Sequence, residues 1–186
     1  MRELFKHYIE NLYDSIPTSL FVWLIVVFVG TFFISVLLIG ITKGVRITAR
    51  ITIAEYLVLL YSSTLLSSVR IYKEIRGCEL LPFWSYASIQ EGRENLIAEN
   101  IMNIAVFIPL GLLFALASEK ITWKHVAICG MAVSVSIEVM QYIFKRGFSE
   151  VDDVIHNTLG CLVGYGIYLI VKKGYEKFSK RSVGVL

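Results

Sequence analysis

Apolar residues gather in five stretches of the chain, each long enough, or nearly long enough, to cross a membrane as a helix. A spanning helix needs about 20 mostly apolar residues. Lipid offers no water to unpaired backbone groups, so this pattern predicts helices. The alternating segments of about ten residues that are typical of a membrane β-barrel are absent. We therefore predict an all-α, polytopic membrane helix bundle with about five transmembrane helices. The expected spans are Thr18–Ile41, Ile53–Val69, Leu96–Ala117, Trp123–Phe144 and Val151–Val171.

The segment before the first span follows a helical period. Apolar residues recur on one face from Leu4 to Ile16, charged residues fill the other, and Pro17 ends the segment. This pattern predicts a short helix lying at the membrane interface. The segment lacks the apolar core of a signal peptide, because its two basic residues are followed by Glu10 and Asp14.

Composition agrees with a membrane protein and argues against other classes. Of the 186 residues, 56% are hydrophobic, and the mean hydropathy is +0.67, which is too apolar for an ordinary soluble domain. The formal net charge of +3 is mild, so we expect no nucleic-acid partner. The three cysteines form no C-x-x-C pair and no disulfide or zinc pattern. Cys129 and Cys161 lie in apolar stretches and are expected to be buried free thiols, whereas Cys78 lies in a long loop.

Orientation follows from the Lys and Arg residues that flank the spans. Eight lie on the side of the N-terminus, and ten lie on the other side, five of them after Val171. The basic C-terminal tail favours an N-terminus outside and a C-terminus inside. We therefore expect a multi-pass protein of the bacterial cytoplasmic membrane.

Polar residues inside the last three spans fall near a single membrane face. Asn103 lies near the start of the third span, Glu138 and Gln141 near the end of the fourth, and Asn157, next to His156, near the start of the fifth. Consecutive spans run antiparallel, so these positions meet at one surface. At about 1.5 Å per residue, Asn103, Glu138 and Asn157 each lie about 10 Å from the near end of their span. Polar groups in lipid are costly and mark function, so we predict a recessed binding site here.

A structural interpretation of the same residues is also open. Glu138 must either stay protonated or find a partner, and a hydrogen bond to Asn103 or Asn157 would make the cluster a knot that holds helices together. Arg146 is placed to pair with Asp152, Asp153 or Glu138, or to hold an anionic headgroup. The long loop 70–95 carries the aromatic segment 80–86, which we interpret as an interfacial anchor or, alternatively, a lid.

Other chemistry finds little support in the pattern. Glu138, Asp152, Asp153 and His156 are by type a possible metal set, but their spacing matches no metal signature. A Ser or Cys nucleophile with a paired base is not evident. We expect no metal and no cofactor, and enzymatic activity stays open, with a non-enzymatic role favoured.

Several motifs in the second half of the chain resemble the VanZ-like family. They are Asn103–Gly111, Ser134 with Glu138 and Gln141, Arg146, and Asp152–Gly160, with Leu81-Pro82-Phe83 in the preceding loop. The resemblance covers roughly residues 53–171. It divides the chain into an N-terminal part (1–52), a VanZ-like membrane domain (53–171) and a basic cytoplasmic tail (172–186). The motif positions that match are Asn103, Phe107, Pro109, Glu138, Gln141, Arg146, Asp152, Asp153, Asn157 and Gly160.

The resemblance implies a small bacterial membrane protein linked to resistance to teicoplanin-type glycopeptides. We expect it to bind a lipid-linked or amphiphilic envelope ligand at the outer leaflet, with membrane lipids, a lipid-linked cell-wall precursor or a lipoglycopeptide as partners. One alternative is an enzyme acting on lipid or cell-wall precursors through Glu138 and the Asp152/Asp153/Arg146 cluster. Another is a membrane scaffold that uses the Gly160-x-x-x-Gly164 stripe. The expected ligand-binding residues are Asn103, Glu138, Gln141, Arg146, Asp152, Asp153 and Asn157.

Overall fold

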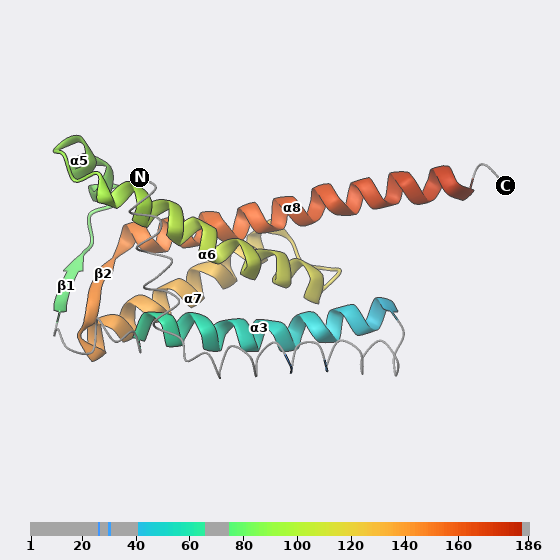
Figure 1. Cartoon of the computed structure of the whole chain (residues 1–186), viewed down its shortest axis with the longest axis horizontal. Helices are drawn as coiled ribbons and strands as arrows, with labels where there is room; N and C mark the ends of the chain where they lie inside the picture. Colours follow the sequence, from blue (N-terminus) through green and yellow to red (C-terminus); the bar gives the residue numbers. More distant parts are fainter. Residues whose placement is uncertain (1–25, 27–29, 31–40, 66–74, 184–186) are drawn as a thin grey trace.

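The computed structural model describes residues 41–65 and 75–183, together with Val26 and Gly30. The expected interfacial helix and, apart from those two residues, the first expected span lie outside this part. The described chain is mostly helical (Figure 1). Its elements are α3 (Ile41–Leu65), β1 (Ile75–Glu79), α5 (Trp84–Gln90), α6 (Asn95–Ala117), α7 (Trp123–Phe144), β2 (Arg146–Glu150) and α8 (Val151–Val183).

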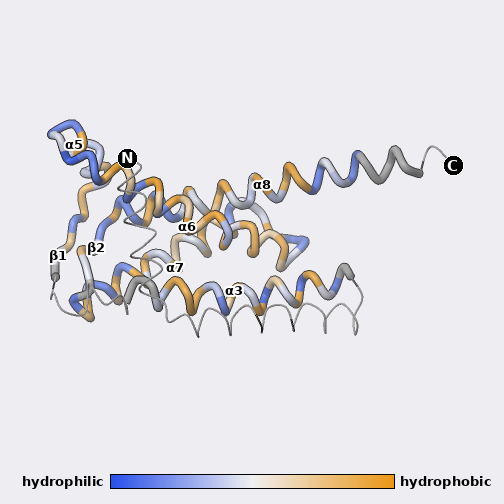
Figure 2. The backbone as a smooth tube through the Cα atoms, in the orientation of Figure 1, coloured by the Kyte–Doolittle hydropathy of each residue, from blue (hydrophilic) through white to orange (hydrophobic). Residues whose placement is uncertain are grey.

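Three of the described helices are long and apolar enough to cross a membrane. They are α6, α7 and Val151–Lys177 within α8, and they match the last three expected spans. Figure 2 shows hydrophobic residues along α6, α7 and the first half of α8, with hydrophilic residues around α5. The prediction of a helical membrane protein is thus confirmed for this part, while the total of about five spans stays a prediction.

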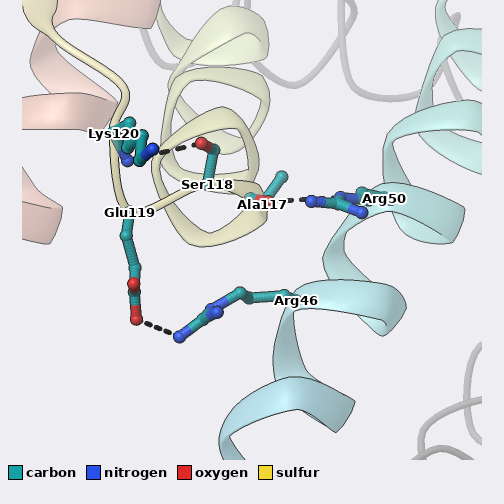
Figure 3. Close-up of polar contacts among 6 residues, drawn as sticks. All are labelled: Arg46, Arg50, Ala117, Ser118, Glu119 and Lys120. Atoms are coloured by element: carbon teal, nitrogen blue, oxygen red, sulfur yellow. Dashed lines mark hydrogen bonds and ion pairs between the residues drawn. The ribbon is translucent and has the colours of Figure 1, made fainter.

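Helix α3 begins twelve residues before the expected second span, so the placement of Lys43, Arg46 and Arg50 in a connection was wrong. Two of these residues, Arg46 and Arg50, contact the end of α6 and the residues just after it (Figure 3). Arg46 forms an ion pair with Glu119. Arg50 Nε donates to the Ala117 carbonyl oxygen over 3.2 Å. A helix C-terminus leaves carbonyl groups unpaired and carries partial negative charge, so a guanidinium group is favourable there.

Aromatic and basic residues mark the same end of the bundle as this Arg pair. Lys124 Nζ lies 5.7 Å from the ring centroid of Trp123, at the start of α7. Lys172 Nζ lies 6.0 Å from that of Tyr168 in α8. Such pairs are typical of membrane interfaces. From Val151 to Tyr168, α8 rises about 26 Å, close to the roughly 30 Å thickness of a bilayer core.

The other end of the bundle is covered by a small parallel sheet that the all-α prediction missed. Strand β1 pairs with β2 in register from Ile75↔Arg146 to Glu79↔Glu150. Helices α6 and α7 intervene between the two strands, so the loops that contain them lie at the same end of the bundle (Figure 1). A Cβ atom on Gly77 would overlap the ring of Phe148, which lies across the sheet.

Glycine allows α8 to pack closely on its neighbours. A Cβ atom on Gly160 would overlap the carbonyl oxygen of Ile104, and one on Gly164 would overlap that of Ile108. The Gly160/Gly164 stripe therefore serves packing within the bundle. The buried core lies alongside and contains Leu60, Phe107, Leu110, Val126, Ile137 and Cys161.

We predict that Gly160→Ala destabilises the protein by about 1–3 kcal/mol, because the added methyl group forces α6 and α8 apart. Gly174→Ala is the matched control, since nothing lies within 4 Å of its added methyl group and alanine favours a helix over glycine by up to about 1 kcal/mol. Thermal unfolding in detergent measures both. Equal stability of the two variants would contradict the close approach of the helices.

Candidate functional site

The loop that contains α5 is fastened to the first turn of α8 by the carboxylate of Asp152. Its Oδ1 atom accepts a hydrogen bond from the backbone N–H of Phe83 over 2.5 Å. Its Oδ2 atom accepts bonds from the backbone N–H and the hydroxyl of Ser85, over 2.9 and 2.5 Å. Asp152 is fully buried, and a buried carboxylate is tolerated only with such compensation. We call this set of three bonds the Asp152 latch.

Two further contacts hold the same loop. Asn100 Nδ2, from α6, donates to the Ser85 hydroxyl oxygen over 3.1 Å. The Tyr86 hydroxyl and His156 Nε2 lie 2.9 Å apart in a hydrogen bond. The loop is therefore bound to both α6 and α8. His156 is not among the matching family positions given above. It is buried, and its bond to Tyr86 helps to hold the loop.

Polar pairs also join the three spanning helices to each other. Asn103 Nδ2, in α6, donates to Asp153 Oδ1 over 2.6 Å. Asn157 Nδ2, in α8, donates to the hydroxyl oxygen of Ser134 in α7 over 2.8 Å. The structure thus brings the expected polar positions of the three spans to one end of the bundle, where the pairs act as the helix-joining knot considered above.

Glu138 connects α7 with the sheet. Its Oε2 atom accepts a hydrogen bond from the backbone N–H of Glu150, at the end of β2, over 2.9 Å. Arg146 begins β2, but its side chain lies outside the described residues. The spacing of Ser134, Glu138 and Gln141 places them on one face of α7, and all three are buried.

The side-chain amides of Gln141 and Asn157 are buried, and the carbonyl oxygen of each accepts no hydrogen bond from the described residues. Gln141 is 6% exposed and Asn157 is 5% exposed. Neither Gln141 Oε1 nor Asn157 Oδ1 has a hydrogen-bond partner among the described residues. A buried acceptor without a partner costs about 1–3 kcal/mol, and native structures hold few of them. The described residues therefore leave both acceptors unsatisfied.

Outside the spans, the carboxyl group of Glu150 has a raised pKa. Partial burial raises the pKa of its carboxyl group to about 7, and the nearby charges of Asp153 and Glu99 act in the same direction, while Trp84 opposes them. The site thus changes charge near neutral pH. Among the residues that the structure describes, no group of three or more acidic, His or Cys side chains is placed to hold a metal.

Sequence reasoning missed several residues of this arrangement. Ser85, Tyr86 and Asn100 hold the loop, and no local pattern announces a contact between positions so distant in the chain. Ser134 was named among the family motifs and lies four residues before Glu138 on the same helix face, but its hydrogen bond with Asn157 was not predicted. Asp152 was expected to bind a ligand, yet both of its oxygens accept bonds from the loop.

Comparison with known proteins identifies the family of the chain. The VanZ/LLP1 family model matches residues 53–172, which cover these helices and the loop. The chain belongs to the VanZ/LLP1 family. The family resemblance predicted from the motifs is therefore confirmed, and all residues of the latch and of the polar pairs fall within the matched region.

One curated relative in this family is Protein VanZ of Enterococcus faecium. The two chains are 30% identical over 98 residues, which cover 53% of this chain and 56% of the Enterococcus protein. The match thus spans about half the length of that relative. No solved structure matches this VanZ/LLP1 protein.

We predict that Asp152→Ala frees the α5 loop, because three donors lose their acceptor. Bonds to a charged group contribute about 1.5–3 kcal/mol each, so the loop should open well before the helices unfold. Hydrogen exchange at Ser85, or limited proteolysis within residues 80–95, measures this. Glu91→Ala, at an exposed position of the same loop, should behave as the wild type. Protection of Ser85 that survives in Asp152→Ala would contradict the latch.

We predict that the stability of this VanZ/LLP1 protein falls as pH rises from about 4.5 to about 7 through Glu150. Below its ordinary pKa of 4.5 the group is neutral in both states, whereas between the two values it ionises only in the unfolded chain. Thermal unfolding across pH should show this loss, and Glu150→Gln should remove that part of it. The exposed Glu94→Gln variant is the control. Identical pH profiles of Glu150→Gln and the wild type would refute the assignment.

Proposed function

We propose that this VanZ/LLP1 protein binds a lipid-linked or otherwise amphiphilic envelope ligand at the outer leaflet and so contributes to resistance to teicoplanin-type glycopeptides. Family membership supports the resistance role. The exposed basic residues Lys172, Lys173 and Lys177 at the end of α8 favour that end as the cytoplasmic one. The polar cluster then faces outward in the bacterial cytoplasmic membrane.

The unused acceptors of Gln141 and Asn157 are the observation that carries the proposal. They call for a headgroup that presents hydroxyl or amine donors, such as a saccharide or an aminated glycopeptide. Glu138 and Asp153 lie in the same cluster and would orient such donors, while Arg146 would hold a phosphate or carboxylate of the same ligand. Amphiphile binding thus suits both the polar interior and the apolar surroundings.

The contacts give less support to the two alternatives. An enzyme would need acidic groups available to a substrate, but Asp152 is fully buried and committed to the loop. A scaffold that used the Gly160/Gly164 stripe would need that surface exposed, whereas α6 covers it. We therefore favour a non-enzymatic ligand-binding role.

We predict that Gln141→Leu abolishes most of the resistance that the protein confers while leaving its stability unchanged or higher. The change removes a buried acceptor without a partner, which does not harm the fold, but it removes a bond to the ligand. That loss amounts to roughly 1–1.5 kcal/mol, or about tenfold in affinity. The teicoplanin concentration that inhibits a susceptible host expressing each variant is the measurement.

Two controls accompany this experiment. Gln90→Leu makes the same change at an exposed position and should keep resistance. Ser134→Ala removes the partner of the Asn157 amide and should lower thermal stability by about 1–3 kcal/mol. Full resistance with Gln141→Leu at normal expression, or no resistance with the wild type, would overturn the proposal.

A further inference from the structure

The outer side of the loop before α5 is apolar and open to its surroundings. Leu80 is 71% exposed, Leu81 is 65% exposed and Phe83 is 59% exposed. Figure 2 shows the hydrophobic stretch between β1 and α5. A run of exposed apolar side chains marks an interaction surface. The inner side of the same loop is polar and bound to the bundle through the Asp152 latch.

Phe83 gives the second observation, which concerns its backbone. Its φ angle of 65° places it in the left-handed region, which glycine adopts freely and a bulky side chain adopts at a cost. The latch keeps this conformation, because the Phe83 N–H donates to Asp152. Glycine would serve the latch better, so the exposed phenylalanine ring has a use of its own.

The position of the loop relative to the spans indicates the surroundings of the Phe83 ring. Asp152 is the second residue of α8, so the loop is held at the level where that span enters the membrane. Large apolar side chains are exposed on the nearby ends of all three spans, including Ile101, Phe144 and Leu159. Those surfaces face lipid when the helices cross a bilayer, and the loop continues them at the headgroup boundary.

We propose that Leu80, Leu81 and Phe83 insert into the leaflet beside the polar cluster, and that the loop is a membrane-anchored cover over it. The partner is the lipid surface. The anchor is linked to the interior, because the ring centroids of Phe83 and Tyr86 lie 6.1 Å apart and Tyr86 bonds to buried His156. The proposal is independent of the ligand proposed above.

Spin labels measure the immersion directly. The full chain, with Cys78→Ser, Cys129→Ala and Cys161→Ala, receives one new cysteine at position 81 or 83 and is placed in bilayers of phosphatidylglycerol and phosphatidylethanolamine. We expect both labels to collide with oxygen more than with a nickel chelate, as a label at lipid-facing Ile170 does. A label at Glu91, an exposed polar position farther along the loop, should favour the nickel chelate.

Two results would overturn the proposal. Labels at 81 and 83 that favour the nickel chelate as strongly as Glu91 would place the loop in water. Labels shielded from both reagents would mean that protein, either another segment of this chain or a second copy, covers the surface. Normal thermal unfolding of each labelled protein confirms that the fold is intact.

A pair of substitutions tests the ring without disturbing the latch. Phe83→Gly keeps the donating N–H and removes the backbone cost, so a loop without a lipid partner would exchange its amide hydrogens no faster. We expect instead a several-fold faster exchange of residues 83–90 in bilayers, whereas Phe83→Leu, which keeps an apolar anchor, should stay within a factor of about two of the wild type. Equal protection in the glycine variant would overturn the anchoring role.

Discussion

The arrangement at one end of this protein depends on a buried carboxylate that finds all its partners in a distant loop. Asp152 is fully buried at the start of α8 and accepts three hydrogen bonds from Phe83 and Ser85. Without those donors the charge would be too costly to bury, and without the charge the loop would lose three of its hydrogen bonds to the bundle. The helix N-terminus adds favourable partial positive charge. The loop and the bundle therefore form one unit, which the contacts of Ser85 with Asn100 and of Tyr86 with His156 reinforce.

The remaining polar residues of the cluster mostly form hydrogen bonds between helices. Most are paired between helices, as in Asn103 with Asp153 and Asn157 with Ser134. Such pairs stabilise the packing and would suffice for a purely structural cluster. The free oxygens of Gln141 and Asn157 are what a structural cluster does not explain. The knot and the proposed binding site are therefore compatible, since Asn157 joins two helices through its amide N–H and leaves its carbonyl oxygen for a ligand.

The sequence predicted the last three spans and the meeting of their polar residues, because lipid demands helices and antiparallel spans return to the same surface. It did not predict the sheet, since Ile75–Glu79 and Arg146–Glu150 are short, charged and without alternation. It also placed Arg46 and Arg50 outside a helix, because their partners at Glu119 and Ala117 become visible only in three dimensions. Asp152 was singled out in the sequence, but its donors in the loop have no local signal.

The latch also has a consequence for biosynthesis. The chain is made from its N-terminus, so the loop with Ser85 leaves the ribosome before α6 and α7, and its acceptor follows only when α8 begins. Two spans must enter the membrane before the loop can close. Strand β1 likewise cannot pair until β2, which follows α7, has been made. Assembly of this region is therefore a late event, and a nascent chain that lacks α8 would present an open loop to chaperones and proteases.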